Sequence, residues 1–231
     1  MHEGPLAIPV LFSLGALHVT QTVVTTWAIM ALLGACAWLF TRRLTLRPGA
    51  AQAALEGVVT ALESAIAAVA PQHARRMLPL IGSLWVYLVV ANLAGLIPGV
   101  HSPTGDLSAT AALALIVFLS VHAFGIAAQG LRGYLRHYLT PSPILLPFHL
   151  ISEVTRTVAL AVRLFGNMMS LEMAALLILL VAGFLVPIPI LMLHIVEALV
   201  QAYIFGMLAL IYVAGGLEAQ QRRRDQPKET T

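Results

Sequence analysis

Charged residues are scarce in this chain. They make up 10% of its 231 residues, while 59% of the residues are hydrophobic. An average soluble domain has about 25% charged residues, so this composition excludes an ordinary soluble domain and favours a protein that lies mostly inside a lipid bilayer. Only helices and closed barrels satisfy every backbone polar group in lipid. The apolar stretches run for about 20 residues without strict alternation, so we predict an all-α, polytopic transmembrane protein.

Cysteine and nucleotide-binding motifs are also nearly absent. The single cysteine, Cys36, excludes an intrachain disulfide and a cysteine metal cluster. It lies in an apolar stretch, where a cysteine behaves as a small hydrophobic residue. No Gly-x-x-x-x-Gly-Lys phosphate loop is present. We therefore expect no nucleotide site, no catalytic residue and no cofactor in this chain. No internal repeat of the kind found in many secondary transporters is evident.

The basic residues are arranged as membrane topology signals. The sequence pI is about 9.4, but the arginines gather at the ends of apolar runs, which argues against nucleic-acid binding and fits the positive-inside rule. An outside N-terminus places eleven of the thirteen basic residues in the cytoplasm: Arg42, Arg43, Arg47, Arg75, Arg76, Arg132, Arg136, Arg222, Arg223, Arg224 and Lys228. We expect no cleavable signal peptide, because no Lys or Arg precedes the first long apolar run.

The apolar runs and their Pro, Gly and Arg breaks predict five spans plus one interfacial amphipathic helix. The expected segments are an outside N-terminus at 1–19, spans at 20–41, 77–97, 107–130, 148–187 and 190–217, a surface helix at 50–72, and a cytoplasmic tail at 218–231. The surface helix is expected because polar residues recur there at spacings of three and four: Gln52, Glu56, Thr60 and Glu63. A full span with two buried glutamates is the alternative.

Two arginines lie within the fourth expected span. Arg163 is the deeper one, and a charge near the bilayer centre costs at least ~3 kcal/mol, which marks a function by default. Arginine does not release its proton, so Arg163 is suited to holding a mobile carboxylate ionised. A structural salt bridge is the alternative. Arg156 lies nearer the start of the segment, where it would snorkel to the interface or pair with Glu153.

Further polar residues follow on the same span and on the last one. Asn167 lies one turn after Arg163 on the same face. Glu172 lies nine residues after Arg163, about 13 Å further along the helix, and we expect it nearer the outer side. A buried glutamate of this kind is able to exchange protons near neutral pH.

The last expected span has three polar residues on one face, His194, Glu197 and Gln201. If Gln201 is level with Arg163 on an antiparallel neighbour, the other two fall near the level of Glu172. Titratable groups would then gather between the outer surface and the arginine, as an aqueous ion entry path requires. A local pair of His194 and Glu197 is one alternative. A zinc site is another, although no third ligand has suitable spacing.

The string Arg163-Leu-Phe-Gly-Asn-Met168 resembles the signature of subunit a of F-type ATP synthases. Three further segments are similar to that family in order and spacing: Asn92-Leu-Ala-Gly-Leu-Ile-Pro98, Pro103-Thr-Gly-Asp-Leu107 and Gln201-Ala-Tyr-Ile-Phe205. The resemblance covers roughly residues 75–215, and the first 70 residues match only in layout.

The resemblance implies a stator subunit that conducts ions past a rotating c-ring, with the last two helices tilted against that ring. Arg163 falls on the essential arginine that faces the ring carboxylate, and Asn167 and Gln201 fall on polar positions near it. Glu172 and His194 fall on the pair that lines a half-channel. An ion enters by one half-channel, binds a ring carboxylate, travels almost a full turn, and leaves by the other.

The implied partners are the c-ring, the peripheral-stalk b subunits, the soluble catalytic head indirectly, and the lipid bilayer of a bacterial plasma (inner) membrane. Protons are the expected ion. The chain departs from the family at Ser170-Leu171, where Ala-Gly is frequent, and at Thr157, where proline is frequent; it also has His194 and Glu197 together. These departures leave the sodium-linked N-ATPase subfamily open. A secondary transporter of an anionic substrate and a purely structural anchor are the remaining alternatives.

Overall fold

The computed structural model describes residues 10–14, 17–42, 45, 49–97, 100–139, 146–182 and 187–224. Within them, the helices are α1 (Gln21–Thr41), α2 (Ala50–Val69), α3 (Ala74–Ala94), the short 3-10 helix η1 (Pro103–Gly105), α4 (Leu107–Leu139), α5 (Leu146–Ala182) and α6 (Pro187–Arg224). Six of them are long and apolar enough to cross a membrane by length and composition. The predicted all-α, polytopic fold is therefore confirmed.

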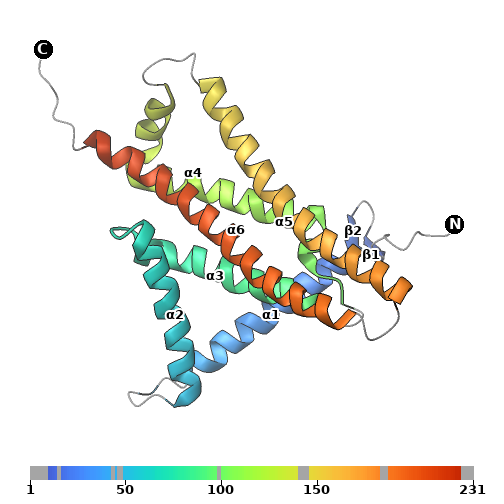
Figure 1. Cartoon of the computed structure of the whole chain (residues 1–231). Coiled ribbons are helices and arrows are strands. Elements are labelled where there is room, and N and C mark those ends of the chain that lie inside the picture. The colour runs from blue at the N-terminus through green and yellow to red at the C-terminus, as the bar shows by residue number, and fades with distance from the viewer. Residues whose placement is uncertain are drawn as a thin grey trace, which may run out of the picture.

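A small β-hairpin precedes the first helix, which the sequence did not predict. Strands β1 (Val10–Leu14) and β2 (Leu17–Thr20) pair antiparallel, with Leu14 opposite Leu17. Val10, Phe12, Val19 and Thr20 are β-branched or aromatic residues of the kind enriched in strands. Strand β2 continues directly into α1 (Figure 1). The segment expected as an outside N-terminus, 1–19, thus contains regular structure at Val10–Leu14 and from Leu17 onward.

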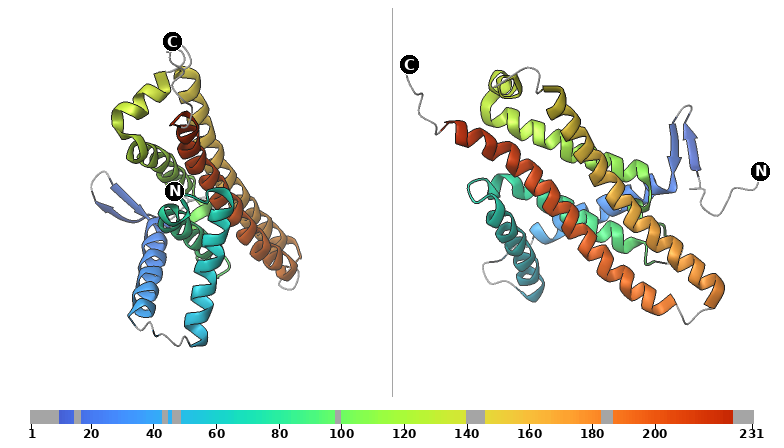
Figure 2. Two further views of the ribbon diagram at one scale, coloured as in Figure 1. Left: turned by 90° about the vertical axis from the view of Figure 1, so that its left-hand side faces the viewer. Right: turned by 45° about the horizontal axis from the view of Figure 1, so that its top comes forward.

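Helix α2 is the least apolar of the six candidates for a membrane span. It stands at a steep angle to α3 and lies at the end of the bundle where α3 begins (Figures 1 and 2). Its polar stripe is exposed, and the amide of Gln52 donates to the carboxylate of Glu56 at 2.7 Å. Near its other end, Glu63 forms an exposed ion pair with Arg75. The assignment of α2 to the membrane surface stays a prediction, since the helix is also long enough to span.

The core lies between α3, α4, α5 and α6, while α1 and α2 stand to one side (Figure 2). In the apolar part of α3 and of α6, half of the residues are buried, compared with 6% of the residues in the apolar part of α1 and of α2. Gly206 of α6 permits the closest approach in this core. A Cβ atom there would overlap the indole of Trp85, which donates to the backbone carbonyl of Tyr203 at 3.4 Å. The small residue therefore brings α3 and α6 together.

The helix bounds differ from the expected spans mainly at their ends. Helix α4 continues to Leu139 beyond the expected end at residue 130. At Gly130 the backbone has φ of +73°, in the left-handed region that glycine adopts without strain. The helix direction changes there, so the apolar part, Leu107–Ala127, and the following turns form two arms. The expected cytoplasmic tail at 218–231 begins as the last turns of α6, which ends at Arg224.

Candidate functional site

Arg163 lies on the exposed face of α5. Its neighbour Leu164 is fully buried in the core, so the arginine side chain points away from the bundle. Within the described part of the chain, Arg163 makes no hydrogen bond or ion pair; the ion pairs there join other residues. The alternative of an internal salt bridge is therefore wrong for the described residues.

Asn167 and Gln201 meet beside this arginine. The amide Nδ2 of Asn167 donates to Oε1 of Gln201 at 2.6 Å and joins α5 to α6. Gln201 is only 1% exposed, and its Nε2 donor has no acceptor among the described residues. A buried, unsatisfied donor costs about 1–3 kcal/mol. The site therefore contains a costly hydrogen-bond donor beside Asn167, which lies one turn after Arg163 on α5. The sequence analysis had considered Gln201 level with Arg163 as a condition for the predicted clustering of titratable groups.

Glu172 contacts the loop between α3 and α4. Its carboxylate accepts the backbone N–H of Ser102 at 3.3 Å and is half-buried. Gly105 lies against it so closely that an added Cβ would be 3.2 Å from both carboxylate oxygens. His101 precedes Ser102 in the same loop, and His194 lies on the neighbouring helix α6. We call Glu172, His101 and His194 the loop cluster.

His194 of α6 is buried against α3. Its Nε2 lies 3.4 Å from the backbone carbonyl of Asn92, and His194 is 4% exposed. A carbonyl only accepts, so Nε2 has the proton in this contact. The structure thus brings His194 and Glu172 from neighbouring helices to the same end of the bundle.

Asn92, Ser102 and Thr104 form a buried network behind the loop cluster that the sequence did not indicate as a site. The hydroxyl of Thr104 donates to Oδ1 of Asn92 at 2.6 Å, and the Asn92 amide donates to the carbonyl of Ala198 at 3.1 Å. Ser102 and Thr104 share a hydroxyl hydrogen bond of 2.7 Å. We call these three residues the loop network. Their segments had been noted only for resemblance, and no local pattern predicts their pairing.

Glu197 and Ser170 stand apart from this network. Glu197 is half-buried one turn after His194, and Ser170 is exposed. Neither makes a hydrogen bond or ion pair within the described residues, so the local pair of His194 and Glu197 does not form there. The described residues also contain no group of three His, Cys, Asp or Glu side chains placed to hold a metal ion.

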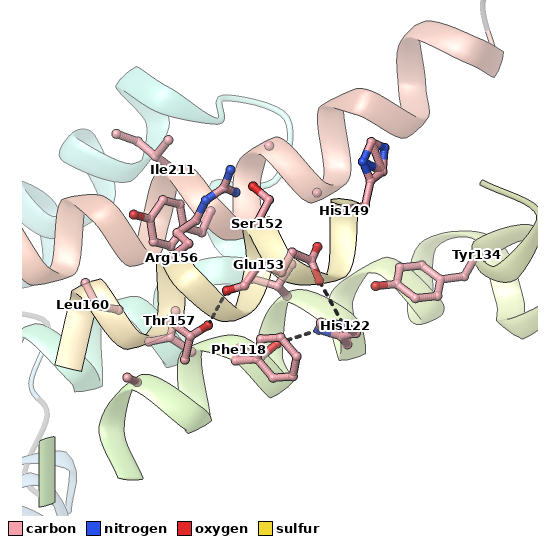
Figure 3. Close-up of a pocket in the computed structure, with 16 residues that line it drawn as sticks. Phe118, His122, Tyr134, His149, Ser152, Glu153, Arg156, Thr157, Leu160 and Ile211 are labelled. Atoms are coloured by element: carbon pink, nitrogen blue, oxygen red, sulfur yellow. Dashed lines mark hydrogen bonds and ion pairs between the residues drawn. The ribbon is translucent and has the colours of Figure 1, made fainter. Parts of the chain in front are cut away.

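A cleft of about 450 Å³ lies at the other end of the bundle, between α4, α5 and α6 (Figure 3). Its polar lining residues are His122, Tyr134, His149, Ser152, Glu153, Arg156, Thr157 and Tyr212. The guanidinium of Arg156 lies 4.8 Å from the centre of the Tyr212 ring, and Glu153 contacts His122 at 3.3 Å. Arg156 therefore stacks on an aromatic ring of α6, and Glu153 contacts a histidine of α4. These contacts differ from the pairing of Arg156 with Glu153 that the sequence analysis offered.

The loop cluster and the cleft lie on opposite sides of Arg163 along α5. Glu172 follows Arg163 by nine residues and Glu153 precedes it by ten. At 1.5 Å per residue, the two carboxylates are about 14 and 15 Å from the arginine along the helix axis. The arrangement is a fixed positive charge between two separate groups of titratable side chains.

Comparison with known proteins assigns the chain to a family. The sequence model described as ATP synthase A chain matches residues 23–214. The chain is 68% identical to ATP synthase subunit a 1 of Hahella chejuensis, over 94% of this chain and 92% of the relative. It is 64% identical to ATP synthase subunit a 2 of Pelobacter propionicus, over 96% and 97% of the two chains. With ATP synthase subunit a of Legionella pneumophila the identity is 57%, over 91% and 92%. This multi-pass membrane protein therefore belongs to the ATP synthase A-chain family, subunit a of the F-type ATP synthases.

Proposed function

We propose that this chain is the stator subunit that translocates ions in the membrane sector of an F-type rotary ATP synthase. It supplies two aqueous half-paths, one at each end of the bundle, and a barrier between them. The observation that carries the proposal is Arg163, exposed on α5 with titratable groups about 14 and 15 Å away on either side. The chain itself catalyses no reaction.

Arg163 is the barrier and the contact for a partner. An arginine facing hydrocarbon without a counter-ion is costly, so the surface that covers this face of α5 must offer a negative charge. A ring of subunits that each carry one membrane carboxylate meets this requirement, which supports the c-ring as the proposed partner. The fixed charge releases the ion from each arriving carboxylate and blocks direct passage between the half-paths.

The loop cluster serves the half-path on the outer side. His101 is exposed in the loop, Glu172 is half-buried, and His194 is buried behind it. Such a gradient of exposure lets protons pass from solvent to groups deeper in the bundle. Asn167 and Gln201 continue the polar lining toward Arg163.

The cleft between α4, α5 and α6 serves the other half-path, on the cytoplasmic side. Its orientation rests on the positive-inside rule, which places the N-terminus outside and the C-terminus in the cytoplasm of a bacterial plasma membrane. The peripheral-stalk b subunits and, through them, the catalytic head are the further partners. Polar side chains from α4, α5 and α6 line the cleft (Figure 3).

Protons are the ion we propose, because each half-path contains imidazole and carboxylate groups that exchange protons. Sodium is the second candidate, since ion choice is set mainly by the binding site on the ring. A lone carboxylate in the ring helix would favour protons, and additional Gln, Ser or Thr oxygens beside it would favour sodium. The sequence of the ring subunit encoded with this chain decides between the two.

The test is Arg163→Ala in the whole complex, reconstituted into vesicles and supplied with ATP. We expect ATP-driven ion pumping to be abolished, because the barrier and the counter-charge are removed together. Arg75→Ala is the matched control, since Arg75 is 95% exposed and its ion pair with Glu63 is a surface contact. Undiminished coupled pumping by Arg163→Ala would overturn the proposed function.

A further inference from the structure

One wall of the cleft has hydrogen-bond donors that no other described residue uses. His149, Ser152 and Arg156 follow one another on α5 at spacings of three and four, so they share one face of that helix. His149 has another interaction partner. The hydroxyl of Ser152 and the guanidinium of Arg156 both point toward α6 (Figure 3). Neither of these two groups makes a hydrogen bond or an ion pair within the described part of the chain.

The Tyr212 ring of α6 holds the guanidinium of Arg156 without using its N–H groups. The central carbon of the guanidinium, Cζ, lies over the ring, 4.8 Å from its centroid. A guanidinium that stacks on an aromatic face keeps its five N–H groups directed outward in its own plane. Two of these groups in parallel match two oxygens of a phosphate or a carboxylate, which is the bidentate contact that arginine favours.

Glu153, the carboxylate that lines the cleft, belongs to the opposite wall. Its Oε2 is buried 3.3 Å from Nε2 of His122 on α4, and Glu153 has a further interaction besides this one. The Glu153 side chain points toward α4, whereas the Arg156 side chain points toward α6 (Figure 3). Glu153 therefore leaves the donors of Arg156 available, and the wall that faces α6 is complementary to an anion.

Arg156 lies near the depth of the lipid headgroups. It precedes Arg163 by seven residues, which is about 10 Å along the helix axis. The hydrocarbon core is about 30 Å thick, so with Arg163 near its centre the headgroups begin about 15 Å away. A long arginine side chain spans the remaining distance by snorkelling. Apolar surface for an acyl chain is close by, because Ile211 lines the same cleft and Ile151 of α5 is exposed.

We propose that the wall of the cleft that faces α6 binds the phosphate of an anionic phospholipid from the cytoplasmic leaflet. Arg156 and Ser152 are its donors, and Tyr212 is a positioning residue that holds the guanidinium. Basic pockets between membrane helices on the cytoplasmic side suit such headgroups. A lipid fits this wall better than free phosphate does, because its acyl chain covers the apolar surface beside the donors. The inference shares only the membrane orientation with the proposed function.

The experiment counts the lipids bound to the purified whole complex by native mass spectrometry, after equilibration with phosphatidylglycerol in a neutral detergent. The variants are Arg156→Gln and Ser152→Ala. Arg75→Gln is the matched control, an exposed arginine outside the cleft that pairs with Glu63. The dependence of the count on phosphatidylglycerol concentration gives the apparent affinity. No ATP is present, so the count does not depend on ion pumping, which Arg163→Ala tests separately.

We expect wild type and Arg75→Gln to bind one phosphatidylglycerol that Arg156→Gln binds about tenfold more weakly, because a charge-assisted bidentate contact is lost. Ser152→Ala should weaken binding about two- to threefold, and this exposed residue decides the question if Arg156→Gln fails to assemble. Unchanged lipid binding in both variants would overturn the lipid site. Displacement of the lipid by millimolar inorganic phosphate would also overturn it, since the wall would then recognise a free anion.

Discussion

The two ends of the bundle hold a glutamate of α5 and a histidine of a neighbouring helix, but they hold them differently. In the loop cluster, Glu172 is bound by a backbone N–H and His194 by a backbone carbonyl. In the cleft, Glu153 and His122 contact each other directly. The first pair is held in position by main chain, whereas the second is a direct side-chain contact between two helices.

The histidines at the two ends also differ in burial. His194 is 4% exposed and stands against the loop network, while the side chain of His122 is 26% exposed in an open cleft. A buried, fully paired network is rigid and specifies one arrangement. If the proposed function holds, we expect the end with the loop cluster to fix the position of its groups and the end with the cleft to be the more open to water.

Among the variants that test this comparison, Asn92→Leu should cause the largest loss of stability. It removes the donor to Ala198 and the acceptor of Thr104 from a completely buried site. Unpaired buried groups cost about 1–3 kcal/mol each, so we expect a destabilisation of roughly 2–4 kcal/mol. Thermal dissociation of the purified membrane sector measures it.

Asn92→Leu should leave the contact between His122 and Glu153 unchanged, since the described residues that line the cleft come from α4, α5 and α6 and not from α3. Ser83→Ala is the control, an exposed residue of the same helix. If Asn92→Leu were as stable as wild type, the rigid character assigned to the loop network would be wrong.

Glu172→Gln should have a smaller and purely kinetic effect. Glutamine still accepts the N–H of Ser102, so the loop keeps its contact, but the side chain no longer exchanges a proton. We expect pumping to slow by about 10- to 100-fold with normal assembly, less completely than in Arg163→Ala. The amount of this chain that co-purifies with the ring checks assembly. A normal rate with a normal pH profile would remove Glu172 from the half-path.

The residues that sequence alone placed correctly depend on local periodicity. The apolar runs predicted the helices, and spacings of three and four predicted that His194 and Gln201 share a face, because 3.6 residues complete a turn. Arg163 was evident because a charge in an apolar run is rare. These features need no knowledge of which helices are neighbours.

The features that sequence reasoning missed depend on tertiary packing. Thr104 and Asn92 are twelve residues apart and meet only because the loop folds back on α3. His122 and Glu153 lie on different helices, and nothing near either residue indicates the other. The hairpin at 10–20 likewise needs strand pairing, which an apolar terminal segment does not reveal. Arg156 was expected to snorkel to the interface or to pair with Glu153, and its contact with the Tyr212 ring of α6 could not be foreseen from α5 alone.

The smallest expected effect comes from Gly105→Ala, which tests whether the position of Glu172 matters as well as its chemistry. The added Cβ would lie 3.2 Å from both carboxylate oxygens, so the carboxylate must move by a few tenths of an ångström. We expect pumping to slow about twofold, equivalent to ~0.4 kcal/mol. Gly57→Ala is the matched control, because no atom lies within 4 Å of the new methyl group on α2. A rate equal to wild type in both variants would mean that the loop cluster tolerates displacement, and the contrast with the cleft would then rest on burial alone.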